Sequence, residues 1–191
     1  MEDRDRLLDL VARVAFERRD VVLSSGKRSD YYMDCRRVTL LPEGALLCGR
    51  VMYDLYRRQM SPVKAVGGPT LGADPLVTAF MLKAMEADEI LPGFLVRKKT
   101  KGHGMANRIE GLYGVSEGAE VLLLEDVLTT GGSLLEALLA VREHGLNPVG
   151  AMVLVDRNEG GADACSKEGL PLFSVFKASE VAAAHDRLKQ D

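Results

Sequence analysis

One segment limits the fold of this chain more than any other: an apolar run that ends in two acids and leads through two glycines into a helix. The four apolar residues at 121–124 predict a strand buried on both faces, which is typical of a parallel sheet. Ser133 and Glu136 have the spacing of a capping box, so we expect a helix from Ser133 to His144, with Gly145 as its C-terminal stop. A strand, a short loop and a helix in this order predict an α/β protein.

The loop between this strand and helix is suited to bind a phosphate group. Its free backbone N–H groups lie at the positive end of the helix dipole, and adjacent glycines allow a ligand to approach closely. The two acids cannot hold a phosphate, but they can accept hydrogen bonds from sugar hydroxyls or hold a hydrated Mg²⁺. An ordinary strand-to-helix turn is the alternative, because many α/β loops contain Gly, Thr and Asp. The residues expected to contact the ligand are Glu125, Asp126, Val127, Leu128, Thr129, Thr130, Gly131, Gly132 and Ser133.

The rest of the chain repeats the alternation of strands and helices. This alternation predicts a parallel sheet covered by helices on both faces, with ligands beyond the carboxyl ends of the strands. A strand–turn–strand unit is expected over 21–33. The 191 residues suit a single domain. Strands are expected at 63–66, 93–97, 121–124, 148–155 and 172–176, and helices at 3–18, 42–55, 72–85, 133–144 and 179–189.

Composition excludes several classes of protein. The net charge of −3 gives no reason to expect nucleic acid or an anionic membrane as a partner. No apolar run approaches the length of a membrane span, and the charged N-terminus lacks the apolar core of a signal peptide. Cys35, Cys48 and Cys165 form neither a disulfide framework nor a zinc-ligand pattern, so we expect a reducing compartment and a cytoplasmic protein. No Gly-x-x-x-x-Gly-Lys-Ser/Thr occurs, which excludes a P-loop kinase.

A second segment carries five cations within twelve residues, with no acid before Glu110. Glycines flank His103, so we expect a mobile loop. The segment follows a predicted strand at the edge where ligands bind, and a mobile cationic lid suits a polyanion whose negative charge grows during a reaction. A solvated charged loop is the alternative. The cations are Arg97, Lys98, Lys99, Lys101 and Arg108.

These segments resemble a known family. Two acids followed by x-x-Thr-Thr-Gly-Gly-Ser after an apolar strand resemble the phosphoribosyl-pyrophosphate (PRPP) signature of type I phosphoribosyltransferases. The lid sequence Arg-Lys-Lys-Thr-Lys-Gly-His-Gly at 97–104 resembles the catalytic loop of orotate phosphoribosyltransferase. The segments 23–34 and 153–158 also resemble that family, so the resemblance spans residues 20 to 160.

The resemblance implies an α/β fold of the type I phosphoribosyltransferase kind: a parallel sheet flanked by helices, in one domain over 1–191, with residues 1–40 contributing a small hood over the base. The implied reaction transfers the phosphoribosyl group of PRPP to orotate, giving orotidine 5′-monophosphate and pyrophosphate in UMP synthesis. Mg²⁺ would be bound mainly through PRPP and water, and no set of protein ligands for a metal is expected. In the family the lid reaches into the neighbouring subunit's site, which implies a homodimer with shared active sites.

The resemblance also implies roles for individual residues. Lys101, Asp126 and His103 are the expected catalytic residues. PRPP contacts are expected from Arg97, Lys98, Lys101, His103 and all the residues of 125–133. A basic side chain can meet a carboxylate, an aromatic ring can stack on a flat base, and an Arg past a buried strand can bind a planar carboxylate bidentately. The expected orotate contacts are Lys27, Tyr31, Tyr32, Thr129 and Arg157.

Two departures from the family pattern affect the site. Many members have a Lys where Ser24 or Ser25 stands, although Lys27 can substitute for it. Some members have a Tyr-Lys whose Lys meets pyrophosphate, and Thr70-Leu71 stand there in this chain, so backbone N–H groups and Thr70 would make that contact. A phosphoribosyltransferase for a purine or uracil is an alternative. A PRPP-sensing regulator without catalysis is another, although the cationic lid disfavours it.

Overall fold

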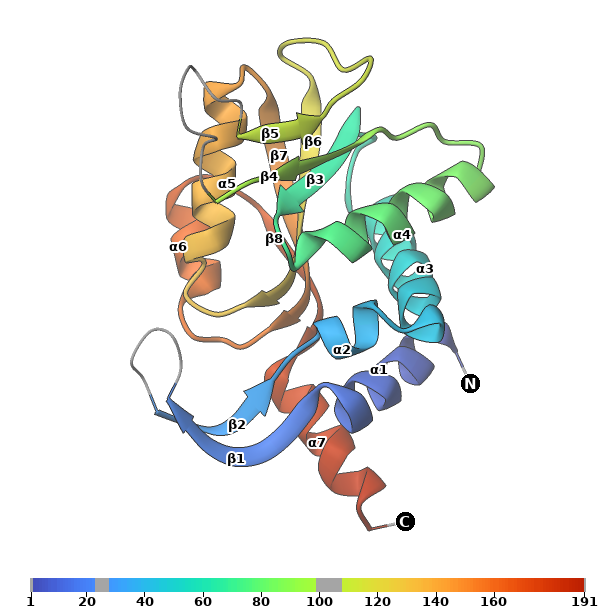
Figure 1. The fold of residues 1–191 in the computed structure, drawn as a ribbon, viewed down its shortest axis with the longest axis vertical. Coiled ribbons are helices and arrows are strands. Elements are labelled where there is room, and N and C mark those ends of the chain that lie inside the picture. The colour runs from blue at the N-terminus through green and yellow to red at the C-terminus, as the bar shows by residue number, and fades with distance from the viewer. Residues whose placement is uncertain (1, 23–27, 99–107, 191) are drawn as a thin grey trace.

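A six-stranded sheet lies at the centre of the molecule (Figure 1). The computed structural model describes residues 2–22, 28–98 and 108–190. The strand order is β5-β4-β3-β6-β7-β8, and neighbouring strands are parallel except for β4 and β5. This is the predicted α/β sheet with one antiparallel strand at its edge. The strands are β3 (Ala65–Pro69), β4 (Gly93–Val96), β5 (Ile109–Gly111), β6 (Glu120–Leu128), β7 (Asn147–Asp156) and β8 (Leu172–Lys177).

Helices bury both faces of this sheet. Successive residues of β6 point to opposite sides, so Leu122 and Leu124 belong to one hydrophobic core and Val121 and Leu123 to the other, all 0% exposed. All four residues at 121–124 are therefore apolar because the strand is buried on both faces of the sheet. The first core is covered by α1 (Asp3–Val14), α3 (Pro42–Gln59), α4 (Ala73–Glu86) and α7 (Ala178–Leu188), and the second by α5 (Gly132–Glu143) and α6 (Gly161–Lys167).

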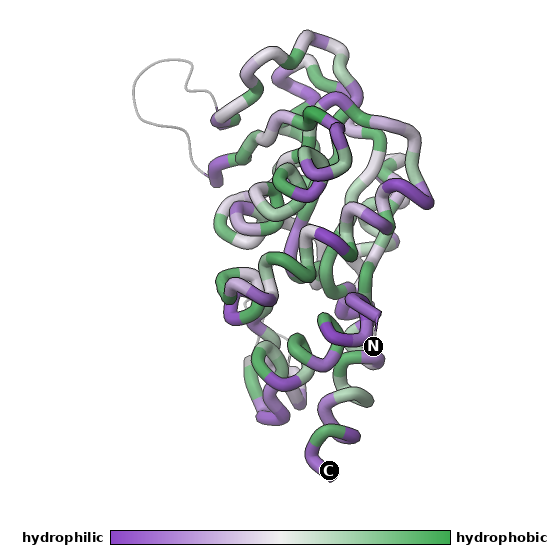
Figure 2. Tube along the Cα trace, turned by 90° about the vertical axis from the view of Figure 1, so that its right-hand side faces the viewer, coloured by the Kyte–Doolittle hydropathy of each residue, from purple (hydrophilic) through white to green (hydrophobic). Residues whose placement is uncertain are grey.

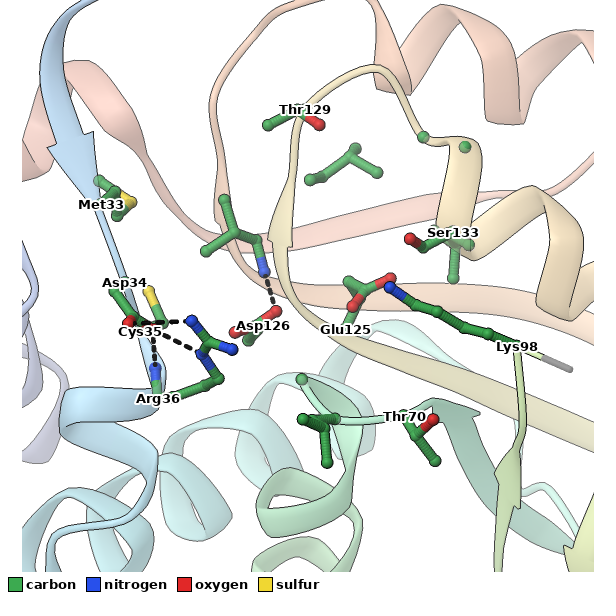
Figure 3. A pocket seen from close by; sticks show the side chains of 17 residues that line it. Met33, Asp34, Cys35, Arg36, Thr70, Lys98, Glu125, Asp126, Thr129 and Ser133 are labelled. Atoms are coloured by element: carbon green, nitrogen blue, oxygen red, sulfur yellow. Dashed lines mark hydrogen bonds and ion pairs between the residues drawn. The ribbon is translucent and has the colours of Figure 1, made fainter. Parts of the chain in front are cut away.

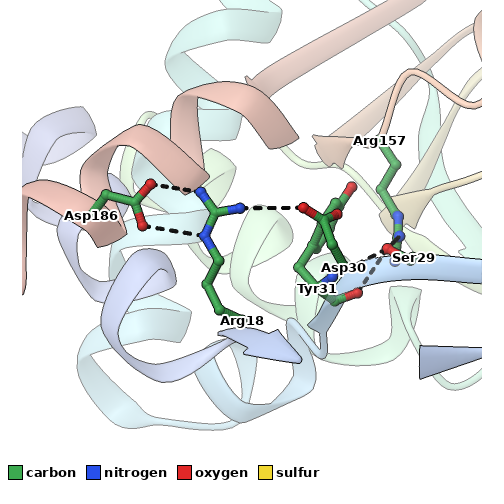
Figure 4. Close-up of polar contacts among 6 residues, drawn as sticks. All are labelled: Arg18, Ser29, Asp30, Tyr31, Arg157 and Asp186. Atoms are coloured by element: carbon green, nitrogen blue, oxygen red, sulfur yellow. Dashed lines mark hydrogen bonds and ion pairs between the residues drawn. The ribbon is translucent and has the colours of Figure 1, made fainter. Parts of the chain in front are cut away.

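A separate strand pair lies at the carboxyl edge of the sheet. β1 (Phe16–Val22) and β2 (Arg28–Met33) pair antiparallel and do not join the main sheet. Arg18 of β1 binds Asp186 of α7 through two hydrogen bonds, of 2.6 and 3.3 Å (Figure 4). Ser29 of β2 accepts a 3.0 Å bond from Arg157, the residue directly after β7. This strand pair lies within residues 1–40, the segment for which a hood over the base is predicted.

The first helix is shorter than predicted, which corrects the expected range of 3–18. It ends at Val14, and Phe16 begins β1 opposite Met33. The Phe16 ring is 1% exposed and stacks on Tyr31, with 5.1 Å between centroids. This tertiary packing outweighs the local helical spacing. Figure 2 shows hydrophobic and hydrophilic residues alternating along the helices near the two termini, as expected for helices with one buried side.

Three short elements were not predicted: α2 (Arg36–Thr39), β5 and α6. Each has seven residues or fewer, too few for a periodic pattern. All the strands and helices that were predicted are present, with shifted boundaries. β6 continues to Leu128, so Glu125 and Asp126 lie inside the strand. Within the part of the chain that the structure describes, no helix has the length and apolarity needed to cross a membrane.

Candidate active site

A cavity of about 410 Å³ opens beyond the carboxyl ends of β3 and β6 (Figure 3). This is where a parallel sheet of this kind binds ligands. Three segments form most of its walls: the end of β6 with the start of α5, the loop after β3, and the residues at the end of β2 and just after it; Lys98, after β4, also lines it. The lining residues are Met33, Asp34, Cys35, Arg36, Thr70, Leu71, Gly72, Lys98, Glu125, Asp126, Val127, Leu128, Thr129, Gly131, Gly132, Ser133 and Leu134.

Two carboxyl groups lie at the floor of the cavity. Glu125 is 7% exposed, and burial raises its pKa to about 9, helped by the charge of Asp126 and opposed by Lys98. Burial also raises the pKa of Asp126, whose Oδ1 accepts a 2.8 Å hydrogen bond from the N–H of Val127. The Arg36 charge acts in the opposite direction on Asp126. At neutral pH the free protein therefore carries a protonated Glu125, which can both donate and accept a hydrogen bond.

The raised pKa of Glu125 makes the stability of the ligand-free protein depend on pH. The folded protein binds this proton more tightly than the unfolded chain, because the pKa is about 9 in the folded protein, against the ordinary 4.5 of a glutamate side chain. The stabilisation that comes from this protonated carboxyl group is therefore fully present below pH 4.5, and it is lost as the pH rises through the folded-state pKa of about 9. Because Gln does not titrate, we expect the stability advantage of Glu125→Gln over the wild type to grow by up to roughly 6 kcal/mol between about pH 5 and about pH 9, as measured by urea unfolding. Parallel pH dependence of the two proteins would contradict the buried proton.

The start of α5 forms an anion cradle. Gly131 is the N-cap with φ 86°, a left-handed conformation that favours glycine, and no side chain caps the helix. The first intrahelical bond runs from the N–H of Leu135 to the carbonyl of Gly131 (2.9 Å), so the N–H groups before Leu135 have no partner inside the helix. The predicted capping box is therefore wrong: Ser133 is the second helical residue and lines the cavity. The uncapped N–H groups are the donors that an anion requires.

The helix end corresponds to the prediction more closely. Gly145 follows the C-cap residue His144 and adopts φ 83°, and its N–H donates to the carbonyl of Arg142 at 3.0 Å. The N–H of Leu146 donates to the carbonyl of Val141 at 3.2 Å. These two bonds are those of a Schellman motif, in which a left-handed glycine ends the helix.

The loop after β3 approaches the carboxylates at Gly72. A Cβ atom on this residue would lie 2.3 Å from Asp126 Oδ1 and 2.9 Å from Glu125 Oε1, so only glycine fits without displacing them. Thr70 is held to β4 by a 3.1 Å bond from its N–H to the carbonyl of Val96. This loop and the first two residues of α4, 70–74, contain no cation.

The third wall was missed by reasoning from the sequence. Asp34, Cys35 and Arg36 follow β2 and line the cavity beside Asp126 (Figure 3). Arg36 is half exposed and donates to both oxygens of Asp34, at 2.8 and 3.0 Å. In the sequence Arg36 and Arg37 look like a solvated charge pair. The nearest signal was that the predicted second strand ends just before an Asp-x-Arg.

A cluster around Arg157 lies near the hood rather than in the lining of this cavity. The Arg157 side chain is 3% exposed, donates to Glu159 (2.7 Å) and Ser29 (3.0 Å), and its Cζ lies 4.3 Å from the centroid of the Tyr31 ring (Figure 4). The structure thus brings together two of the predicted orotate contacts. Tyr32 follows Tyr31 in β2 and contacts the Arg19 guanidinium, with 4.4 Å from Cζ to the ring centroid.

The remaining predicted residues fall into three groups. Lys98 lines the cavity and points toward Glu125 (Figure 3). Arg97 and Thr130 do not line it; Arg97 instead bonds Glu110 at 2.9 Å. Lys27, Lys101 and His103 lie outside the described residues. The described residues contain no group of three or more His, Cys, Asp and Glu that would hold a metal ion.

An anion cradle and a buried pair of acids, joined by the same strand of a mostly parallel sheet, define a phosphoribosyltransferase domain. Residues 42–172 match the family model described as the phosphoribosyl transferase domain. The chain is 45% identical over 185 residues to the orotate phosphoribosyltransferase of Aquifex aeolicus (strain VF5), covering 95% of this chain and 98% of that protein. It is 40% identical over 185 residues to that of Nostoc sp. (strain PCC 7120), covering 97% and 88%.

A solved structure agrees with these relatives. The crystal structure of Mycobacterium tuberculosis H37Rv orotate phosphoribosyltransferase in complex with PRPP has a TM-score of 0.76 and 38% identity, covering 94% of this chain and 99% of that one. The chain therefore belongs to the orotate phosphoribosyltransferase family. The predicted family and fold class are confirmed.

Proposed function

We propose that this protein transfers the phosphoribosyl group of PRPP to orotate, giving orotidine 5′-monophosphate and pyrophosphate. One observation carries the proposal: a single cavity joins an uncapped helix start, two buried acids and a cation at the edge of the lid segment. PRPP offers a matching set of groups, with a 5-phosphate, two ribose hydroxyls and a diphosphate. The family relatives support orotate as the acceptor.

In this reaction the C1–O bond to the diphosphate breaks, a bond from a ring nitrogen of orotate to C1 forms, and the proton of that nitrogen is released to solvent. The N–H groups at the start of α5 and the hydroxyls of Thr129 and Ser133 hold the 5-phosphate. Glu125 and Asp126 hold the ribose hydroxyls, and the Asp126 charge stabilises the positive charge that develops on the ribose. No protein nucleophile is required, because positioning and electrostatic stabilisation lower the barrier.

The cations act on the other side of the bond that breaks. The diphosphate gains negative charge as it leaves, and preorganised cations stabilise that charge more in the transition state than in the ground state. Lys98 lines the cavity. The predicted lid residues Lys101 and His103 would close over the diphosphate, with Lys101 as the first choice for catalysis.

Mg²⁺ fits this site as a partner of the substrate. The acid pair supplies two carboxyl groups, fewer than the donors that a protein-held Mg²⁺ needs, so PRPP oxygens and water would complete its coordination. When bound, the ion neutralises part of the charge on the diphosphate. Among the described residues of the cavity, Glu125 and Asp126 are those whose carboxyl groups would face the ion.

The Arg157 cluster is the candidate site for the base. Its guanidinium is fixed by Glu159 and Ser29 and lies over Tyr31, which leaves the fork able to meet a planar carboxylate or carbonyl edge. Lys27 and Tyr32 stay predicted contacts. The proposal includes a homodimer in which the lid of each subunit completes the active site of the other. It also places the enzyme in UMP synthesis in the cytoplasm, a reducing compartment that suits the buried free thiols.

The activity test follows the absorbance of orotate after PRPP and Mg²⁺ are added. We expect orotate to be consumed, while hypoxanthine, adenine and uracil are not. Turnover of one of those bases in place of orotate would show a phosphoribosyltransferase of different specificity. PRPP binding without turnover of any base would favour the regulator, and would overturn the proposed reaction.

A further inference from the structure

We propose that Arg36 is the fixed cation that binds the diphosphate of PRPP and the pyrophosphate product. This inference rests on the proposed function and deepens it. The leaving diphosphate needs a cationic partner, and the loop after β3 supplies no positive charge. Arg36, on the neighbouring wall of the cavity, would be that partner. Arg36 lies in the described part of the chain, where its contacts are defined.

Asp34 fixes the position of the Arg36 side chain. The Nε and Nη2 groups donate to the two Asp34 oxygens at 2.8 and 3.0 Å, and the Arg36 backbone N–H donates to Oδ1 at 3.2 Å. Asp34 is itself anchored, because its N–H donates to the carbonyl of Ala15 at 2.9 Å and its side chain is only 16% exposed. A guanidinium has five N–H donors, and this bidentate clamp uses two of them. The others stay available to a ligand in the cavity.

The position of Arg36 selects the diphosphate over the 5-phosphate. In Figure 3 the acids separate two sides of the cavity: Thr129 and Ser133 lie on one side, and Arg36 and Thr70 on the other. The first side is the anion cradle at the start of α5. The second faces the loop that leads into α4, whose first residues supply only backbone N–H groups and the Thr70 hydroxyl as donors. A diphosphate attached to a ribose that is held over the acids extends to this second side.

Charge balance gives the same assignment. Asp34, Glu125 and Asp126 line the cavity, against the cations Lys98 and Arg36 among the described residues. Lys98 points toward Glu125, on the opposite side of the acids from Arg36 (Figure 3). Lys98 and Arg36 are the two described cations of the cavity, so without Arg36 a diphosphate held between the loop after β3 and the acids would lose one of its two cationic partners. A guanidinium binds phosphate oxygens bidentately, which suits a group that gains charge as it leaves.

The neighbouring Arg37 offers a matched control. It has the same charge and an exposed side chain, but it binds Glu17 and does not line the cavity. The experiment compares Arg36→Gln, Arg37→Gln and the wild-type protein. Competition calorimetry measures the affinity for magnesium pyrophosphate and, separately, for ribose 5-phosphate, which reaches only the cradle and the acids. Steady-state kinetics give KM for PRPP and for orotate.

We expect Arg36→Gln to weaken pyrophosphate binding about 10- to 100-fold and to lower kcat/KM for PRPP to a similar extent. Affinity for ribose 5-phosphate and KM for orotate should stay within about twofold, and Arg37→Gln should match the wild type. Asp34→Asn tests the positioning role: it should weaken pyrophosphate binding, and the double variant Asp34→Asn/Arg36→Gln should be no weaker than Arg36→Gln alone.

Two results would overturn the assignment. Pyrophosphate affinity within twofold of the wild type in Arg36→Gln would remove Arg36 from the diphosphate site. A selective rise in KM for orotate would place Arg36 at the base instead. Both differ from failure of the proposed function, which the wild-type protein would show by not consuming orotate. Thermal unfolding of each variant identifies any loss of fold, in which case Arg36→Lys, which keeps the charge, takes the place of Arg36→Gln.

Discussion

Asp126→Asn is expected to lower kcat by more than about 100-fold while leaving the thermal unfolding temperature close to that of the wild type. The amide has nearly the same shape but lacks the charge that faces the developing positive ribose. One wall of the cavity is built around this side chain, because Gly72 approaches its Oδ1 too closely for a Cβ atom to fit between them. An isosteric change therefore tests the charge rather than the packing. Steady-state turnover of orotate with PRPP measures the effect.

A matched control exists on the same strand. Glu120 is exposed at the opposite end of β6, so Glu120→Gln removes one carboxylate without touching the cavity. We expect this variant to turn over at the wild-type rate. Normal turnover in Asp126→Asn would contradict the role of Asp126 at the ribose.

Lys101→Ala is expected to lower kcat by roughly 10²- to 10³-fold, by analogy with the loss of one donor to a transition-state charge. The reason is the growth of negative charge on the departing diphosphate, to which the lid is expected to supply cations. The structure describes the residues on either side of this segment. Lys98 lines the cavity, and Arg108 binds Glu136 of α5 at 3.9 Å, so the described residues bordering the segment lie beside the anion cradle.

Lys99→Ala is the control for the lid. It removes the same charge two positions away, at a residue with no predicted contact to PRPP, and kcat should change by no more than a factor of a few. Steady-state kinetics at saturating PRPP and orotate give both values. A kcat for Lys101→Ala as high as that of Lys99→Ala would exclude Lys101 from the chemical step.

The cradle and the acids could be predicted because they lie in one continuous segment. Residues 121–133 carry their own fold signal, since an apolar run, two acids and two glycines each have a local physical meaning. The detail of the helix start could not be predicted. The capping-box spacing of Ser133 and Glu136 is satisfied by many helix starts, and here the left-handed Gly131 is the N-cap, so the helix begins at Gly132, one residue earlier than predicted.

The Arg36 wall could not be predicted because it depends on distant packing. Arg36 lies beside Asp126 because the first helix ends at Val14 and Phe16 pairs with Met33. This pairing places the residues after β2 next to the sheet. Helical spacing up to residue 18 gave no sign of this pairing. Arg157 was predictable as a residue that follows a buried strand, whereas its bonds to Ser29 and Glu159 depend on where the strand pair lies.

Isothermal titration of PRPP into the wild-type protein with Mg²⁺ present tests the central claim, that the cradle and acids bind PRPP. We predict saturable binding at one site per chain, and competition by ribose 5-phosphate for that site. Absence of saturable binding, or binding that ribose 5-phosphate leaves unchanged, would contradict the assignment of this cavity.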